Sequence, residues 1–348
     1  MPAANTNRKS RTKPQSKIGR SLPALSEFIE QRPADLNEKV TNREILAAVI
    51  SDVHVSHEPP RARSKEKDWY AAMDRYLLEF KNVCHKYNIP GLIAGDLFHT
   101  PDEPYQLVNY LRNVLPKRVI AIPGQHDLLH HNYDDLFKTA YGDLVASGRI
   151  ENAIAEEPII IRNYLAVYGF PWRQKLSLVQ RAKGAKLHVG LLHRYVWTAG
   201  CSWGGSTPPK SRHVDRTLRA LKNLDLIFSG DNHICFNRGR LYNCGCFIPR
   251  ISNERQYEPM IHLIRADGEV LFHHVSTTSD VWCDEDDSVE ELKPIIEVKK
   301  VMKSLKKLTQ SGIDFLQVLE RAAENATISK RAQQLLDEIV CEVKRGAK

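Results

Sequence analysis

Carboxylate, imidazole and amide side chains recur at five places in this sequence, each time at the end of a short apolar run. The runs are ILAAVIS, GLIA, RVIAIP, LHVGLLH and DLIFSG. Such side chains bind divalent cations and move protons, so water activation on a bound metal is the first chemistry that the pattern suggests. The polar residues that end or follow the runs are Asp52, His54, Asp96, Gln125, His126, Asp127, His193, Asp231 and His233.

The apolar runs have the length and composition of buried strands, and amphipathic stretches separate the first three of them. We expect helices over 66–88 and 104–115, which gives the alternating pattern of an α/β domain. EPIIIR and YLAVYGF predict a hairpin around Asn163, and MIHLIRADGEVLFHHV predicts another at its Asp-Gly turn. Because open α/β sheets bind ligands beyond the carboxyl ends of their strands, the five polar groups are predicted to meet at one rim.

A single Asp-x-His after a strand is more often a cap or a surface turn than a metal ligand. The ordered set of five is a stronger signal, because burying many charged groups together is unfavourable unless cations neutralise them. The donor types suit Mn²⁺, Mg²⁺, Fe²⁺ or Zn²⁺, and a carboxylate shared by two ions would hold them close enough to activate one water. Glycine precedes Asp96, Gln125 and Asp231, which we expect to let the backbone turn sharply towards the ions.

The series DVH, GDLFH, GQHD, LLH and GDNH resembles the signature of the calcineurin-like metallophosphoesterases, D-x-H, G-D-x-x, G-N-H-D/E, H and G-H-x-H. The resemblance covers about residues 45 to 275 and implies an α/β fold, a two-sheet metallophosphoesterase sandwich flanked by helices. GDLFH followed by Pro101 and Pro104, and the later stretch NCGCFIPRISNERQYEPMIHLI, are similar to the SbcD-type DNA-repair nuclease branch.

The resemblance also implies a role for each polar residue. His126 would stabilise the transition state or protonate the leaving oxygen, Asp127 would orient His126, and His99 would position the substrate. The implied ligands are Asp52, His54 and His233 for one ion, Gln125, His193 and Asp231 for the other, and Asp96 as the bridge between them.

Two positions depart from the family pattern, and both belong to the second ion. Gln125 stands where asparagine is usual, and Asp231 stands where histidine is usual. The second site is therefore either retuned towards a harder cation such as Mg²⁺ or Mn²⁺, or weakened. We favour retuning, because both residues still offer oxygen donors.

Composition limits the class of protein and of partner. The net charge of +8 and the pI near 9.0 favour an anionic partner without identifying it. Seven cysteines without a CxxC pair argue against a disulfide framework or a thiolate zinc site and fit a cytoplasmic protein; Cys244 and Cys246 are expected to be buried thiols at a strand end. No apolar run has membrane-spanning length, so we expect no membrane association.

Composition also divides the chain into four parts. Residues 1–20 form a basic tail that we expect to be flexible, and that either has no function or grips a phosphate backbone. Residues 21–44 are a docking segment, 45–282 the catalytic domain, and 283–348 an acidic linker with a small helical C-terminal extension. The apolar stripe of that extension either packs on its own core or binds a partner.

Together with the resemblance, these observations favour a Mn²⁺-dependent DNA exonuclease, endonuclease or both, acting in DNA repair, recombination or degradation. By the resemblance, the C-terminal helices could dock an SbcC-like coiled-coil ATPase, and the subunit could form a homodimer. Two alternatives stay open: a hydrolase of nucleotides, phosphoproteins or small phosphate esters, and a scaffold that no longer holds metal. Several other side chains are either part of a nucleic-acid surface or ordinary loop and surface residues, namely His130, His131, Tyr195, Trp197, Trp203, Lys210, Arg212, Arg216 and Arg219.

Overall fold

The computed structural model describes residues 40–202 and 208–283. The predicted basic tail, most of the docking segment, Trp203 and the C-terminal extension from residue 284 lie outside this part of the chain. The chain divides after Trp282, and the description below concerns the unit that ends there.

The first sheet has six strands in the order β12-β11-β1-β2-β3-β4. The four strands from β1 to β4 are parallel, whereas β11 runs antiparallel to β1 and to β12. Alternate residues of β1 enter different cores: Ala48 and Ile50 pack towards helices, and Ala47 and Val49 pack towards the other sheet. The strands are β1 (Ile45–Ile50), β2 (Gly91–Ala94), β3 (Val119–Ile122), β4 (Glu151–Asn152), β11 (Met260–Arg265) and β12 (Val270–His274).

The second sheet also has six strands, in the order β5-β6-β7-β8-β10-β9. The central strands from β6 to β10 are parallel, and β5 and β9 close the two edges in antiparallel pairs. The strands are β5 (Ile159–Ile161), β6 (Leu165–Phe170), β7 (Leu187–His193), β8 (Leu226–Gly230), β9 (Phe236–Arg238) and β10 (Leu241–Asn243).

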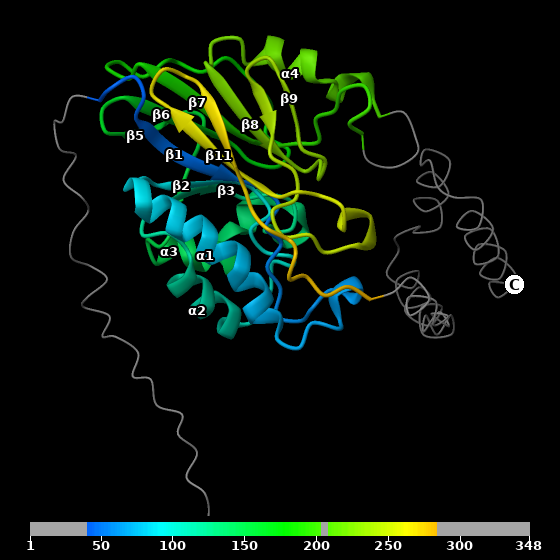
Figure 1. Cartoon of the computed structure of the whole chain (residues 1–348). Coiled ribbons are helices and arrows are strands. Elements are labelled where there is room, and N and C mark those ends of the chain that lie inside the picture. The colour runs from blue at the N-terminus through cyan, green and yellow to red at the C-terminus, as the bar shows by residue number, and fades with distance from the viewer. Residues whose placement is uncertain (1–39, 203–207, 284–348) are drawn as a thin grey trace, which may run out of the picture. The chain divides into compact units, whose positions relative to one another are not determined.

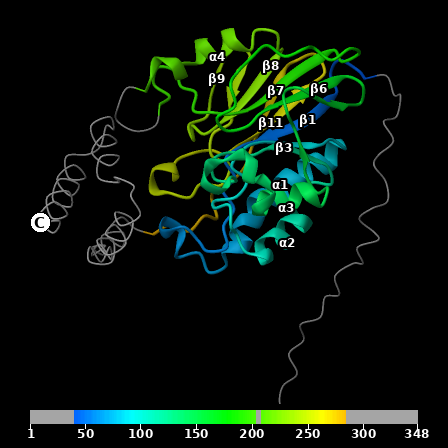
Figure 2. The ribbon, with the colours of Figure 1, turned by 180° about the vertical axis from the view of Figure 1, so that it is seen from behind.

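Helices cover the outer faces of both sheets. Figures 1 and 2 show α1, α2 and α3 on one side of the strands and α4 on the other. The longest of them, α1, begins after Asp68, whose side chain accepts a hydrogen bond from the Ala71 amide (3.0 Å), and ends at Asn88 in the left-handed conformation. The α-helices are α1 (Trp69–Tyr87), α2 (Tyr105–Val114), α3 (Ala140–Ala146) and α4 (Val214–Ala220), and the 3₁₀-helices are η2 (Arg61–Arg63), η3 (Leu129–His131), η4 (Tyr133–Lys138), η5 (Lys210–Arg212) and η6 (Ser252–Glu254).

The predicted two-sheet α/β sandwich is confirmed, as are both hairpins. The β5–β6 turn places Arg162 and Asn163 at φ 52°, and the β11–β12 turn places Gly268 at φ 85°. The sequence pattern did not indicate α3, β4 or β9, because elements of two to seven residues are too short to show a hydrophobic period. The strand end expected at Cys244 is the end of β10. Among the described residues, no helix is both long enough and apolar enough to cross a bilayer.

The layer between the sheets contains a buried histidine. His262 on β11 is 1% exposed and lies among the rings of Phe228, Tyr242 and Phe272, at centroid distances of 5.9, 6.2 and 5.2 Å. Burial lowers the pKa of His262 to about 4, because the imidazolium form loses its hydration in this apolar layer.

The pKa of His262 predicts a loss of stability in acid. Between about pH 6.5 and pH 4 the unfolded chain binds a proton at this position and the folded chain does not, so the free energy of unfolding falls as the pH falls. The full contribution is on the order of 3 kcal/mol. His262→Phe should flatten the pH dependence of urea unfolding in this window, measured in EDTA, whereas His85→Gln on the exposed face of α1 should not. An equally steep profile in His262→Phe would contradict this assignment.

Candidate metal centre

The predicted site residues come together at one end of both sheets. The first sheet supplies Asp52 and His54 beyond β1, Asp96 beyond β2 and Gln125 beyond β3, and the second supplies its residues from the ends of β7 and β8. The parallel direction of these strands brings all five carboxyl ends to the same edge, so the site lies across the sandwich.

The backbone at this edge is held in an uncommon conformation. Asp52, His54, Asp96 and Asp231 all have positive φ, between 47° and 79°. A positive φ costs a residue with a Cβ of order 1–3 kcal/mol, and such residues cluster where the surrounding structure imposes them for function. Four of the seven predicted ligands therefore occupy strained positions.

The first predicted ligand group is compact. The Nε2 atoms of His54 and His233 lie 3.3 Å apart, and an Asp52 carboxylate oxygen lies 3.9 and 3.7 Å from them. All three ligand atoms lie within 4.8 Å of one another, which is the size of one coordination sphere. The structure thus brings together the three side chains expected to hold the first ion.

His193 of the second predicted group lies close to Asp96 and Asp52, and the ligand atoms of these three residues are all within 4.8 Å of one another. His193 Nε2 lies 3.2 Å from Asp96 Oδ2, and Gln125 Nε2 donates to Asp231 Oδ1 (3.0 Å). The Asp231 amide in turn donates to both carboxylate oxygens of Asp52, at 3.0 and 3.1 Å, which ties the two groups to each other.

Asp96 has the geometry of a bridge. Its Oδ1 accepts a hydrogen bond from the His126 amide (2.8 Å), which fixes the carboxylate. Its Oδ2 lies 3.6 Å from His54 Nε2 in the first group and 3.2 Å from His193 Nε2 in the second. This position between imidazoles of the two groups is compatible with the bridging role that the resemblance implies for Asp96.

Backbone and carboxylate acceptors fix the tautomers of two ligand imidazoles. His193 Nδ1 donates to the Ala94 carbonyl (2.7 Å), and His233 Nδ1 donates to Glu254 Oε1 (2.6 Å). Each ring therefore carries a proton on Nδ1, which leaves Nε2 as the atom that faces the site and can bind a metal.

Whether the site suits metal ions can be judged from the hydrogen bonds of its ligand atoms. Among the seven predicted ligands, five buried atoms lack a hydrogen bond of good geometry in the described part of the chain, although buried polar atoms in proteins are rarely unpartnered. One of them is His54 Nδ1 in the first group. The other four belong to the bridge or to the second predicted group, and each can ligate a cation. They are Asp96 Oδ2, Gln125 Oε1, His193 Nε2 and Asp231 Oδ2, and the Asp96 and His193 atoms lie 3.2 Å apart. The residues therefore fit two divalent cations.

Gly124 and Gly230 leave space for ligand side chains of neighbouring strands. The expectation was instead that these glycines would let the backbone approach the ions. A Cβ on Gly124 would lie 2.1 Å from Asp96 Oδ1, and a Cβ on Gly230 would lie 2.0 Å from Ser51 Oγ and 2.7 Å from Asp52 Oδ2. Each glycine thus lets a ligand of a neighbouring strand pack against the backbone.

The charges of the site respond to each other and to burial. Burial raises the pKa of Asp52 to about 6, and it raises the pKa of Asp231 as well. Burial alone would lower the pKa of His193, but the negative charges of Asp96, Asp52 and Asp231 raise it well above its ordinary value. Several carboxylates thus lie close together in a poorly hydrated site, and bound cations would stabilise their ionised forms.

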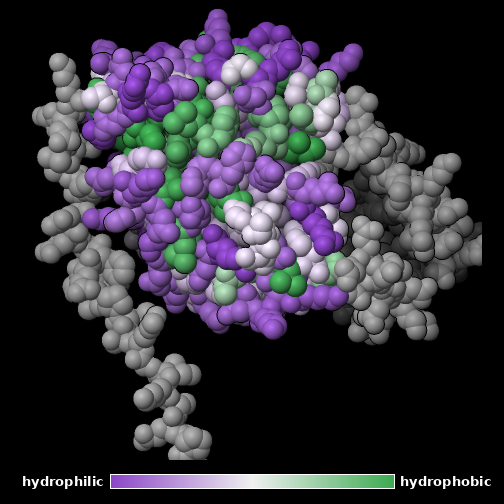
Figure 3. Space-filling model, viewed as in Figure 1, coloured by the Kyte–Doolittle hydropathy of each residue, from purple (hydrophilic) through white to green (hydrophobic). Residues whose placement is uncertain are grey.

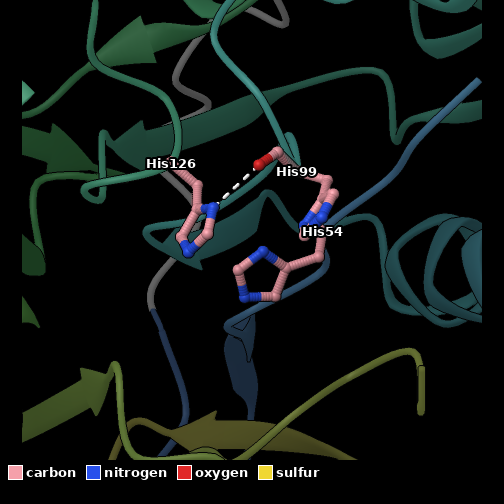
Figure 4. A group of neighbouring side chains, drawn as sticks. All are labelled: His54, His99 and His126. Carbon is pink, nitrogen blue, oxygen red and sulfur yellow. Dashed lines mark hydrogen bonds between the residues drawn. The ribbon is translucent and has the colours of Figure 1, made fainter. Parts of the chain in front are cut away.

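A histidine pair lies beside the first ligand group (Figure 4). The rings of His99 and His126 stack at a centroid distance of 5.4 Å, and the His126 ring meets the His54 ring edge-on at 4.8 Å. His126 Nδ1 donates to the His99 carbonyl (2.7 Å), so its Nε2 is the atom that can exchange a proton. Burial, followed by the positive charge of Arg250, lowers the pKa of His99 to about 4, so His99 is a neutral ring.

Asp127 was expected to orient the His126 ring, but its hydrogen bonds are to backbone amides. Its carboxylate accepts hydrogen bonds from the backbone amides of Leu97, Phe98 and Gly124, at 3.2, 2.8 and 2.9 Å, and the described structure has no hydrogen bond from it to the His126 ring. The His99 carbonyl orients the ring instead. Asp127 holds together the two loops that carry Asp96 and Gln125.

Sequence reasoning missed two residues that support the site. Glu254 is 1% exposed, binds His233 Nδ1 and accepts the backbone amides of Arg250 and Ile251, at 2.7 and 3.1 Å. Arg250 donates to the carbonyl of His54 (2.6 Å). Both lie in the IPRISNER stretch that follows the last ligand, and the only signal in the sequence was its resemblance to the nuclease branch.

Two exposed histidines and two buried cysteines lie close to the predicted ligands in the sequence. His131 is exposed and its Nδ1 donates to the Gln125 carbonyl (2.9 Å), so it positions that loop, whereas His130 is exposed in the same turn. Cys244 and Cys246 are buried as expected, and burial raises their pKa values well above the ordinary range. Such thiols stay protonated and are poor metal ligands.

Comparisons with known proteins identify a family and similar solved structures. The family model for calcineurin-like phosphoesterase matches residues 45–235. No curated protein sequence matches the chain. Similar solved structures include a candidate 5′-nucleotidase from Staphylococcus aureus (13% identity, 70% of this chain and 56% of that chain, TM-score 0.39). They also include a metallophosphoesterase from Sphaerobacter thermophilus (15% identity, 67% of this chain and 89% of that chain, TM-score 0.34). The chain thus spans 56% of the length of the first structure.

The Glu254–His233 contact predicts a measurable loss of metal affinity. Glu254→Gln removes the charge that makes His233 a stronger donor, and loss of such a partner typically costs 10- to 100-fold in affinity. Calorimetric titration of the metal-free protein with Mn²⁺ should show weaker binding of one ion. The control is Glu258→Gln, which changes an exposed carboxylate, and it should bind both ions as the wild type does.

The second ligand group predicts how the site chooses its metal. If Gln125 and Asp231 retune the second metal site towards harder cations, the wild type binds two Mn²⁺ or Mg²⁺ ions per chain. Asp231→His should then shift the preference of this site towards Zn²⁺, because it adds a nitrogen donor. Elemental analysis and competitive titration measure both effects, with the exposed Asp134→His as the control. A wild type that binds only one ion under saturating Mn²⁺ would show that the site is weakened.

Proposed function

Because this chain belongs to the calcineurin-like phosphoesterase family, whose members bind two divalent metals, we propose that it hydrolyses phosphodiester bonds of DNA with Mn²⁺ as the working ion. The observation that carries this proposal is the set of four unpartnered buried ligand atoms around Asp96, beside the His99–His126 pair. When bound, two divalent cations would supply Lewis-acid polarisation of the phosphoryl group and a water of lowered pKa.

The chain's own residues provide orientation and proton transfer. Asp52, His54, Asp96 and His193 are almost wholly buried, so they keep a fixed geometry against which a phosphate can align. In hydrolysis a new bond forms from water oxygen to phosphorus, the ester bond breaks, and the departing oxygen needs a proton. His126 can provide that proton from Nε2, because its Nδ1–H is already committed to the His99 carbonyl.

DNA is proposed as the substrate on two grounds. The chain carries a net charge of +8, which favours a polyanion over a neutral small molecule. The GDLFH motif and the stretch around Arg250 and Glu254 resemble the SbcD-type nuclease branch, and the structure gives both segments a place at the site. A role in DNA repair, a homodimer and an SbcC-like ATPase partner belong to the same proposal.

The first test compares two small substrates. A phosphodiesterase should turn over bis-p-nitrophenyl phosphate faster than p-nitrophenyl phosphate in the presence of Mn²⁺, because its site is adapted to a diester. The reverse preference would favour the alternative of a phosphomonoesterase acting on nucleotides or phosphoproteins. No turnover of either substrate by protein that holds two ions would contradict hydrolysis itself.

The second test addresses His126. His126→Gln should lower kcat for the diester and for end-labelled DNA by about 10²- to 10⁴-fold, the usual contribution of a general acid. The variant should keep both metal ions, because His126 is not among the ligands. His130→Gln, in the exposed turn nearby, should keep wild-type turnover. Wild-type cleavage by His126→Gln would remove this residue from the mechanism.

A further inference from the structure

The surface beside β7, η5 and α4 carries basic side chains that the reaction at the metal centre does not use. Two cavities of about 350 and 320 Å³ lie there, and Arg216 lines both of them. Figure 3 shows mainly hydrophilic residues at the top of the visible face, where Figure 1 places α4. We call this region the basic groove and define it by Lys175, Arg194, Lys210, Arg216 and Arg219.

The positive charge of the basic groove is not neutralised within the part of the chain that the structure describes. Arg112, Arg118 and Arg181 each pair with a carboxylate at 2.5 to 2.9 Å, but none of the five groove residues has a carboxylate of residues 40–202 or 208–283 within 4.0 Å. Asp215 is the one acidic residue among the described groove-lining side chains, and it is already shared by Arg238 (3.2 Å) and His213 (3.4 Å).

An uncompensated cluster of cations in a concave surface repels itself and attracts anions. The cost of holding these side chains together is recovered when a polyanion releases its own counterions on binding them.

The basic groove is attached to the metal centre. Arg194 directly follows His193, the last residue of β7. Asn232, which is wholly buried between two predicted ligands in the sequence, donates from Nδ2 to the carbonyl of Val196 (2.8 Å). The chain leaving β7 is therefore fixed to the ligand loop after β8, and Arg194 of the groove is one residue away from His193 of the site.

An aromatic side chain is fixed among these cations. Trp197 lines the larger cavity, its Nε1 donates to the Pro209 carbonyl (3.0 Å), and its ring meets His213 edge-on at a centroid distance of 4.8 Å. A ring held in this way loses little entropy when a base stacks on it. Aromatic rings interleaved with basic groups are characteristic of sites that bind unpaired nucleic-acid strands.

We infer that the basic groove binds an unpaired strand of a nucleic-acid substrate, with phosphates against Arg216 and Arg219 and a base on Trp197, while the scissile phosphate lies at the metal centre. This inference rests on the proposed function. A duplex does not fit the same description, because its bases are already stacked and have no free face for the indole.

The test separates binding in the groove from chemistry at the metals. Binding is measured by fluorescence anisotropy of a labelled single-stranded oligonucleotide and of its duplex, with Mn²⁺-loaded protein that carries His126→Gln so that the strand stays intact. Chemistry is measured separately, as turnover of bis-p-nitrophenyl phosphate, in protein with His126 present. This small diester reaches the metal centre without occupying the groove.

Charge reversal and loss of the ring have distinct expected effects. Arg216→Glu with Arg219→Glu should weaken single-strand binding at least tenfold and lower the slope of log affinity against log salt concentration by about 1. Trp197→Leu should weaken single-strand binding about fivefold or more and affect the duplex less. All these variants should turn over the small diester within twofold of the wild type. Lys117→Glu, an exposed residue at the opposite end of β3, is the matched control and should change none of these quantities.

Three other outcomes would overturn the inference, and they differ from failure of the proposed function. If the charge-reversal variant binds the single strand as tightly as the wild type does, and the wild type still cleaves DNA, the groove is not the binding site but the nuclease proposal stands. Tighter binding of duplex than of single strand removes the unpaired strand as the occupant. Wild-type protein that cleaves the small diester but neither binds nor cleaves DNA removes both the groove and the DNA substrate.

Discussion

The dominant electrostatic feature of this protein is a group of three carboxylates that meet at the ends of three strands, those of Asp52 and Asp96, which are buried, and Asp231, which is part-buried. Burial raises the pKa of Asp52 and of Asp231, whereas at Asp96 the neighbouring imidazoles of His193 and His54 outweigh burial and lower the pKa. Hydrogen bonds further stabilise the carboxylates: Asp52 accepts the Asp231 amide, and Asp96 accepts the His126 amide. The buried oxygens that remain unpartnered among the described residues are suited to binding cations.

The two-sheet sandwich is what makes this concentration of charge possible. Each sheet alone brings only part of the ligand set to its edge, and the apolar layer between the sheets, with Val49, Ile122, Leu191 and Phe228, holds the two edges together. Positive φ angles at four ligands and close packing at Gly124 and Gly230 show how little freedom the edge retains. Rigid placement of this kind lowers the reorganisation that a reaction would otherwise require.

Around the ligands, a second set of residues fixes proton positions and loop positions. Glu254 and the Ala94 carbonyl set the tautomers of His233 and His193, and the His99 carbonyl does the same for His126. Asn232 extends this network to the chain that leaves β7 and thus to the basic groove. The candidate metal centre and the basic groove are thus connected by one network of hydrogen bonds, although their residues belong to different sheets and loops.

Local patterns in the sequence predict the order and type of the candidate ligands, the buried strands that carry them and both hairpins. Apolar runs, turn residues and adjacent polar residues are enough for this, because each of these features is local. The sequence also indicated the family, since the motifs keep their order along the chain. Only the tertiary structure decided that Asp96 lies between His54 and His193, that Glu254 supports His233, and that Asp127 holds loops instead of the His126 ring. These contacts join residues from about 20 to nearly 100 positions apart, and their geometry depends on how strands and loops pack, which no local period in a sequence encodes.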